Sequence, residues 1–159
     1  MIVFASPCTG KSYLNQHHPD RFYDAASWRD ASDNLDSWYT STSTTCNKVL
    51  AQGKTLLFAT HRSYYGFGFD AMIRRFQQDG HSVLLVRPER RAKEEYMERR
   101  RQFPHPDRMY DIEAYRLHVE KNWDKWMDDL EPYTGAPQLI LKPYEFLSDH
   151  ITEITTHPT

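Results

Sequence analysis

The 159-residue sequence contains little cysteine and little glycine, and its charges nearly balance. Two cysteines, Cys8 and Cys46, are too few for a disulfide framework, and they form none of the Cys/His spacings typical of zinc sites. The net charge of -2 excludes a protein that coats nucleic acid by bulk charge, although a local basic site stays possible. No apolar run approaches the roughly 20 residues that cross a bilayer, so the sequence predicts no membrane span.

The sequence also lacks an internal repeat, a low-complexity linker and a leader-like N-terminus. We therefore expect one domain over residues 1–159 and a location in the cytoplasm. Aromatic residues, in contrast, are plentiful at 14% of the chain, which supplies bulk for a hydrophobic core.

Short apolar runs alternate with helical patterns along the chain. Buried strands are predicted at 2–5, 21–24, 55–61, 83–86 and 139–141, and helices at 13–16, 35–52, 70–79, 89–102, 111–131 and 144–151. Most of these strands are apolar throughout, which predicts an α/β fold with a mainly parallel sheet covered by helices on both faces. Ligands of such sheets bind beyond the carboxyl ends of the strands. These ends lie just after Ala5, Asp24, His61 and Val86.

The first of these strand ends carries a phosphate-loop pattern. Residues 5–12 read A-x-x-x-x-G-K-S, which differs from G-x-x-x-x-G-K-[ST] only at Ala5. In such a loop backbone N–H groups and a helix N-terminus bind phosphate, and Gly10 permits a close approach of the backbone. Lys11 is expected to bind the β- and γ-phosphates, and the Ser12 hydroxyl is expected to ligate Mg²⁺. The residues predicted to bind the nucleotide are Ser6, Pro7, Cys8, Thr9, Gly10, Lys11, Ser12 and Tyr13.

Two absent motifs narrow the class of nucleotide-binding protein. The sequence has no N-K-x-D after a strand, which GTPases use to read the base, and the strand that ends at His61 lacks the Walker B acid. Both absences favour a small kinase, in which catalysis depends on positioning and electrostatics.

Asp24 and His61 are the candidates for handling the acceptor. Asp24 is expected to accept a hydroxyl proton or to hold Mg²⁺ through water, and the alternative is an ordinary Asp that caps a turn. His61 could orient the acceptor or cap the next segment.

A basic segment follows the fourth predicted strand, and its cations are Arg87, Arg90, Arg91, Lys93, Arg99, Arg100 and Arg101. Small kinases carry a lid at this position, and guanidinium groups there neutralise charge on the transferring phosphate. The alternative is a solvated helix in which the arginines pair with Glu94, Glu95 and Glu98. We expect both: some arginines pair locally, and one or two face the phosphates.

Two aromatic groups are further candidates for base stacking. Trp123 and Trp126 are spaced for one face of a helix, which favours a core position over a stacking platform. The glycine-containing segment Tyr64–Phe69 follows the third strand, where it could stack on a nucleobase or serve as a packed connector.

The chain resembles a family of small phage and bacterial P-loop kinases with an adenylate-kinase-like fold. The resemblance extends over most of the chain and rests on GKSYL followed by HPDRFYD, on FATHR, on RPERRAKEEYMERR, and on NWDKWMDDLE followed by LKPYEFLSD. It implies a three-layer fold with five strands in the order 2-3-1-4-5 and the use of ATP with Mg²⁺. Arg90 and Arg99 match the family's lid arginines, within a lid-like segment of about 87–108. They therefore join Lys11 and Asp24 as the expected catalytic residues.

The resemblance leaves the phosphoryl acceptor open. Some phage relatives are similar to kinases that phosphorylate 5-hydroxymethyluracil within DNA, and others resemble nucleoside monophosphate kinases. We therefore expect transfer of the ATP γ-phosphate to a nucleotide-type acceptor, with that DNA hydroxymethyl group as the leading candidate. In the family the second strand ends in a D-x-D-S-like group, of which Asp24 and Ser27 match while Ala26 replaces the second acid. This replacement and the missing Walker B acid keep a non-catalytic nucleotide-binding module as an alternative.

Overall fold

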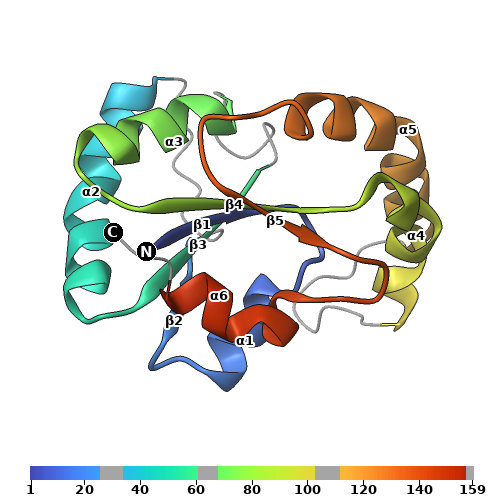
Figure 1. The fold of residues 1–159 in the computed structure, drawn as a ribbon, viewed down its shortest axis with the longest axis horizontal. Coiled ribbons are helices and arrows are strands. Elements are labelled where there is room, and N and C mark those ends of the chain that lie inside the picture. The colour runs from blue at the N-terminus through green and yellow to red at the C-terminus, as the bar shows by residue number, and fades with distance from the viewer. Residues whose placement is uncertain (26–33, 61–67, 103–111, 157–159) are drawn as a thin grey trace.

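A five-stranded sheet forms the centre of the computed structural model, which describes residues 1–25, 34–60, 68–102 and 112–156. Its strands are β1 (Ile2–Ala5), β2 (Phe22–Asp24), β3 (Thr55–Ala59), β4 (Val83–Pro88) and β5 (Gln138–Leu141). The strands pair in parallel in the order β2-β3-β1-β4-β5 (Figure 1). The predicted α/β fold and its strand order are confirmed.

Helical segments connect the strands and cover the sheet. They are α1 (Lys11–His17), α2 (Leu35–Ala51), α3 (Phe69–Gln78), the 3-10 helix η3 (Arg90–Ala92), α4 (Lys93–Gln102), α5 (Ile112–Leu130), the 3-10 helix η4 (Leu147–His150) and α6 (Ile151–Thr156). The prediction of a helix from Tyr144 was wrong at its start. Tyr144 has a left-handed backbone with a φ of 69°, and the Glu145 carboxylate accepts a hydrogen bond from the Lys142 N–H, so residues 142–145 form a turn instead.

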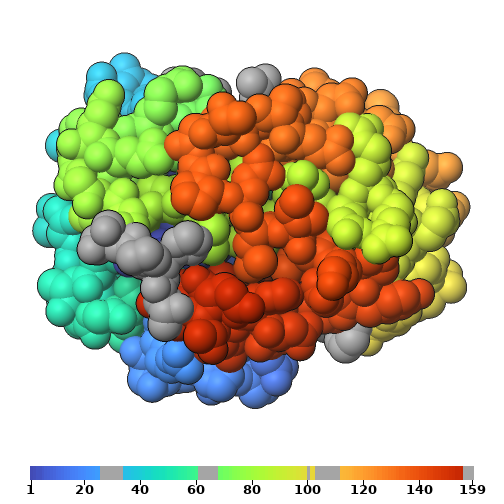
Figure 2. Space-filling view, viewed as in Figure 1, coloured from blue at the N-terminus to red at the C-terminus, as the bar shows by residue number. Residues whose placement is uncertain are grey.

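The strands bury both of their faces, which explains why they are apolar throughout. Side chains point alternately to opposite faces of a strand, so Ile2 and Phe4 enter one core while Val3 and Ala5 enter another. Residues from α2, α3, α4 and α5 complete the first core, and residues from α1, η4 and α6 complete the second. In the space-filling view the C-terminal elements lie beside α1, which η4 contacts (Figure 2).

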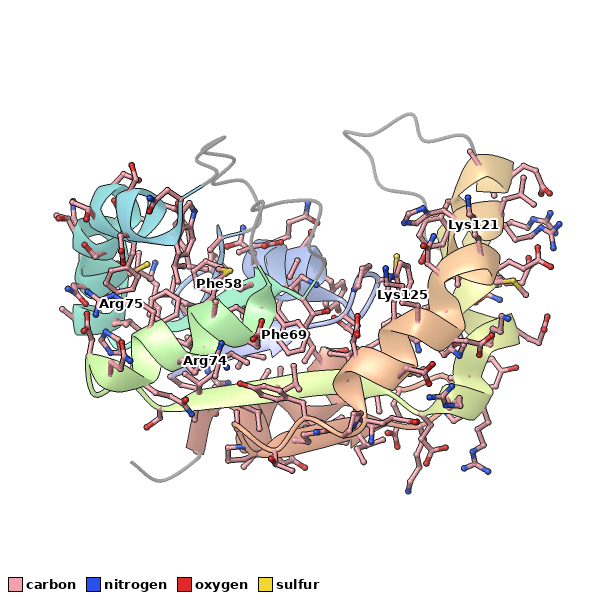
Figure 3. The ribbon with its side chains drawn as sticks, turned by 90° about the horizontal axis from the view of Figure 1, so that it is seen from above. Phe58, Phe69, Arg74, Arg75, Lys121 and Lys125 are labelled. Carbon is pink, nitrogen blue, oxygen red and sulfur yellow. The ribbon has the colours of Figure 1, made fainter. Side chains whose placement is uncertain are left out.

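Aromatic rings fill much of the first core. Phe58 of β3 lies between α2 and α3, with its ring centroid 6.0 Å from that of Trp38 and 5.4 Å from that of Phe76 (Figure 3). Trp123 is buried, and its indole N–H donates to the backbone oxygen of Arg90 at 2.9 Å, while Trp126 packs half-buried at the edge of the core. The expectation that this tryptophan pair belongs to the core is confirmed.

The parallel sheet brings the segments after its strands to one edge. Ala5 pairs with Ala59 on one side and with Val86 on the other, so β1, β3 and β4 reach this edge together. The phosphate-loop residues follow β1 directly and lead into α1. Within the part of the chain that the structure describes, no helix combines the length and apolar character needed to cross a membrane.

Candidate functional site

The loop between β1 and α1 contains two residues with a left-handed backbone, a feature of anion-binding nests. Cys8 and Gly10 both adopt left-handed conformations, with φ values of 58° and 98°, and they flank the fully buried Thr9. Alternation of left- and right-handed residues turns successive N–H groups toward one concave side, where they attract an anion. The helix α1 begins at Lys11, so its N-terminus adds the partial positive charge of the helix dipole.

Three carbonyl groups of this loop, those of Ser6, Cys8 and Thr9, accept hydrogen bonds from donors of the protein. The Ser6 oxygen accepts from the Thr9 hydroxyl at 2.9 Å, and the Thr9 oxygen accepts from the Leu147 N–H at 2.9 Å. The Cys8 oxygen accepts from the Arg99 guanidinium at 2.9 Å. A phosphate would meet repulsion from carbonyl oxygens, so their commitment elsewhere favours anion binding at the loop.

Lys11 lies back across its own loop. Its ammonium donates to the Ala5 oxygen at 3.0 Å and to the Ser6 oxygen at 2.8 Å, and only 8% of the residue is exposed. Both acceptors are neutral carbonyls, so a phosphate, which carries full negative charge, would compete for the same ammonium. The ammonium of Lys11 therefore lies at the loop, where a bound phosphate could replace the two carbonyl oxygens as its partner.

Ser12 and Asp24 meet beside the loop. The Ser12 hydroxyl donates to Asp24 Oδ2 at 3.0 Å, and the Asp24 N–H donates to the side-chain oxygen of Asn15 at 3.1 Å. Asp24 ends β2 opposite Leu57 of β3, which in turn pairs with Val3 of β1. This register places the end of β2 next to the first turn of α1, so both predicted residues come together.

The Ser12–Asp24 pair fits a magnesium site. Mg²⁺ in phosphoryl-transfer sites binds few protein oxygens and completes its octahedron with water and substrate phosphates. A hydroxyl and a carboxylate oxygen 3.0 Å apart beside a phosphate loop supply that donor set. No group of three or more His, Cys, Asp or Glu side chains among the described residues could hold a metal ion.

Arg90 is held against α5. Its guanidinium donates to Glu131 at 2.8 Å and to Asp128 at 2.7 Å, and a carboxylate oxygen of Asp124 lies 3.7 Å away. The hydrogen bond from Arg90 is the main cause that lowers the pKa of Glu131, so the pair stays charged at neutral pH. In this conformation Arg90 binds carboxylates on α5, which are long-range partners, whereas the alternative had named the local residues Glu94, Glu95 and Glu98.

Arg99 lies on the other side of the basic segment and faces the phosphate loop from within the protein. It is only 1% exposed, and its partners are Glu95, the Cys8 oxygen and the Glu145 oxygen. Arg90 and Arg99 therefore bind separate sets of partners. Their predicted role in stabilising the transferring phosphate stays a prediction.

Several predicted groups are only partly covered by the structure. Ala26, Ser27 and His61, like most of the Tyr64–Phe69 segment, lie outside the described residues. The last residue of that segment, Phe69, begins α3 and packs its ring edge-to-face against Tyr133, with centroids 5.3 Å apart. Tyr13 is 50% exposed on α1, where its ring stacks on that of His17.

The two cysteines have different surroundings. Burial raises the pKa of the Cys46 thiol in α2 to about 12, which makes that thiol unreactive. The thiol of Cys8 accepts a hydrogen bond from the Tyr115 hydroxyl of α5 at 2.9 Å. The loop is thereby tied to α5 as well as to α4.

The structure adds residues that sequence reasoning missed. Asn15 is one helical turn beyond Ser12 and holds the backbone of Asp24, and its place on the face of α1 could have been found from spacing. Phe146 and Leu147 lie against Thr9 and Gly10, although about 137 positions separate them along the chain. No local sequence pattern indicates that Phe146 and Leu147 lie beside this loop.

A substitution of Gly10 tests the backbone shape of the loop. A Cβ at Gly10 would have room, since its nearest neighbour is Phe146 at 3.7 Å, but a φ of 98° is unfavourable for residues with side chains. A left-handed backbone costs alanine about 1–2 kcal/mol, so residue 10 would relax toward another conformation and displace the loop N–H groups. We therefore expect Gly10→Ala to lower nucleotide affinity about tenfold. Binding of ATP measured by calorimetry checks this.

Gly53 provides the matched control. It also has a left-handed φ of 75°, and a Cβ there would meet no atom within 4 Å. Gly53→Ala should therefore cost similar stability in urea unfolding, yet leave nucleotide affinity unchanged. Equal affinity losses in the two variants would contradict the assignment of the loop.

Comparisons with protein families and curated proteins identified no relative of this chain. No protein-family model matches the chain, and a search of curated proteins found no significant match.

Proposed function

We propose that this protein is a Mg²⁺-dependent kinase that transfers the γ-phosphoryl group of ATP to a nucleotide-type acceptor. One observation carries the proposal. The loop with left-handed residues at Cys8 and Gly10 has the Lys11 ammonium bound across it, and the hydrogen-bonded Ser12–Asp24 pair lies directly beside it. Phosphate-binding N–H groups, a lysine ammonium and oxygen ligands for a divalent ion are the parts that phosphoryl transfer requires.

Each part has a separate task in the proposed reaction. The loop N–H groups and the α1 N-terminus bind the phosphates, and Lys11 leaves the Ala5 and Ser6 oxygens to bind the β- and γ-phosphates. Ser12 and Asp24 would hold Mg²⁺, which supplies neutralisation of the negative charge on the phosphate oxygens. These interactions orient the γ-phosphate toward the acceptor.

Asp24 would also activate the acceptor in the proposed reaction. It would take the proton of the acceptor hydroxyl as that oxygen forms a bond to the γ-phosphorus, while the bond from phosphorus to the β–γ bridging oxygen breaks. ADP leaves with the bridging oxygen and its electron pair. Arg90 and Arg99 stay candidates for charge neutralisation, which would require each to exchange its present partners for phosphate.

The test is transfer of labelled γ-phosphate from ATP to two acceptor sets in the presence of Mg²⁺. One set contains the nucleoside monophosphates, and the other contains duplex DNA with or without 5-hydroxymethyluracil. We expect label in an acceptor, with the hydroxymethylated DNA as the leading candidate, and no transfer when Mg²⁺ is removed by chelation.

The acceptor that carries label identifies the substrate class. Label only in hydroxymethylated DNA would make the protein a DNA-base kinase, whereas label in a monophosphate would make it a nucleotide kinase. Tight ATP binding with no transfer to either set would contradict the kinase proposal and favour a nucleotide-binding module.

A further inference from the structure

Arg99 is a buried cation at the meeting point of three segments. Each of its three nitrogens donates a hydrogen bond: Nε to Glu95 at 2.7 Å, Nη1 to the Cys8 oxygen at 2.9 Å and Nη2 to the Glu145 oxygen at 3.0 Å. Burial of a charge is costly unless the charge is paired and its donors are satisfied. The planar guanidinium reaches α4, the phosphate loop and the turn before η4 simultaneously, which a lysine ammonium is too compact to do.

Aromatic rings hold the plane of this guanidinium. Its central carbon lies 4.0 Å from the ring centroid of Tyr96 and 4.2 Å from that of Phe146. Phe146 also lies 3.7 Å from the position that a Cβ of Gly10 would occupy. The ring therefore lies against the guanidinium and beside Gly10, and the two rings leave Arg99 little freedom to turn.

The contact with the Cys8 oxygen determines the direction of a loop N–H. In a trans peptide the C=O of one residue and the N–H of the next point in opposite directions. Because the Cys8 oxygen points to the interior at Arg99, the Thr9 N–H points away from Arg99. By the same geometry, the Thr9 oxygen accepts from the Leu147 N–H, so the Gly10 N–H points away from Leu147.

The strain at Cys8 makes such a support necessary. A left-handed φ of 58° is unfavourable for a residue with a Cβ, and it persists only where surrounding contacts enforce it. The hydrogen bond from Arg99 to the Cys8 oxygen is such a contact. The turn that carries Glu145 is itself fixed, since its carboxylate accepts from the Lys142 N–H, the main cause that lowers the pKa of Glu145.

We infer that Arg99 is a positioning residue that aims the N–H groups of the phosphate loop, with Glu145–Leu147 as its support. This inference rests on the proposed nucleotide binding, and it gives Arg99 a role that needs no contact with the transferring phosphate. A cation that bound the γ-phosphate would affect ATP and not ADP. A cation that shapes the loop affects both nucleotides equally, because both place their β-phosphate in the loop.

Calorimetric binding of ATP and ADP to Arg99→Lys tests the inference. Lysine keeps the charge but cannot reach both carbonyl oxygens, and hydrogen bonds of charged groups are strong, so we expect both affinities to fall about tenfold. Arg74→Lys on α3, an exposed position, is the matched control and should bind both nucleotides as the unaltered protein does. Loss of ATP affinity with ADP affinity unchanged, or no loss of either, would overturn the inference.

A rescue experiment separates loop shape from general damage. Glycine adopts left-handed conformations without strain, so Cys8→Gly in the Arg99→Lys background should recover part of the lost affinity. Cys8→Ala in the same background removes the thiol equally but keeps a Cβ, and it should recover nothing. Equal recovery, or none in the glycine variant, would contradict a role through the backbone of residue 8.

Two further measurements keep the outcomes distinct. Should Arg99→Lys fail to fold by circular dichroism, Glu95→Gln loosens the Nε contact while keeping its volume, and a parallel fall of both affinities is expected. Unchanged affinities in that variant would overturn the inference.

Lys11→Ala tests the proposed function separately. If the unaltered protein and Lys11→Ala bind ATP with the same affinity, nucleotide binding at the loop is refuted, and this inference is refuted with it.

Discussion

Replacement of Lys11 by alanine is expected to lower phosphoryl transfer about a hundred- to a thousandfold while the fold stays intact. The Lys11 ammonium lies at the loop, where it donates to the Ala5 and Ser6 oxygens. Loss of one preorganised charge at a transferring group typically has an effect of this size. Steady-state transfer of labelled phosphate, measured at saturating ATP, gives the comparison.

The fold should survive because the substitution removes no apolar core residue. Lys11 is the first residue of α1, where alanine is a good helix former, and the Ala5 oxygen keeps its hydrogen bond from the Thr60 N–H. Lys48→Ala removes an exposed lysine from α2 and should transfer phosphate normally. Transfer by Lys11→Ala at the rate of the unaltered protein would refute the phosphate-loop assignment.

Replacement of Asp24 by asparagine should abolish most of the transfer and leave ATP binding nearly unchanged. Loss of a general base typically costs about 10²–10⁴ in rate. The amide oxygen of asparagine can still accept from the Ser12 hydroxyl, and the backbone contact to Asn15 does not depend on the side chain. Single-turnover transfer beside ATP calorimetry checks both halves of the expectation.

Two roles of Asp24 can be separated by the same variant. If the carboxylate mainly holds Mg²⁺, higher Mg²⁺ concentrations should restore part of the transfer, whereas a proton acceptor cannot be replaced in this way. Asp20→Asn, on the exposed turn before β2, is the matched control and should be fully active. A fully active Asp24→Asn would exclude both roles.

The sequence by itself determined the strands, their order along the chain and the phosphate-loop pattern of residues 5–12. Runs such as 55–59 and 83–86 are apolar on both faces, and only a parallel sheet covered by two helical layers buries both. The loop pattern is local, since Gly10, Lys11 and Ser12 are adjacent in the sequence and their proposed roles depend on the backbone shape there and on the start of a helix. The approach of Asp24 to this loop also followed, because all strands of a parallel sheet end at one edge, but its hydrogen bond with Ser12 came only from the structure.

Only the tertiary structure decided which long-range partners each arginine binds. Arg90 and Arg99 belong to one short basic segment, yet packing turns the first toward the carboxylates of α5 and the second toward loop carbonyls. The partners of Arg99 at Cys8 and Glu145 lie 91 and 46 residues away along the chain. A cation binds whichever acceptors long-range packing presents to it, and carbonyl groups, which every residue carries, leave no mark in the sequence.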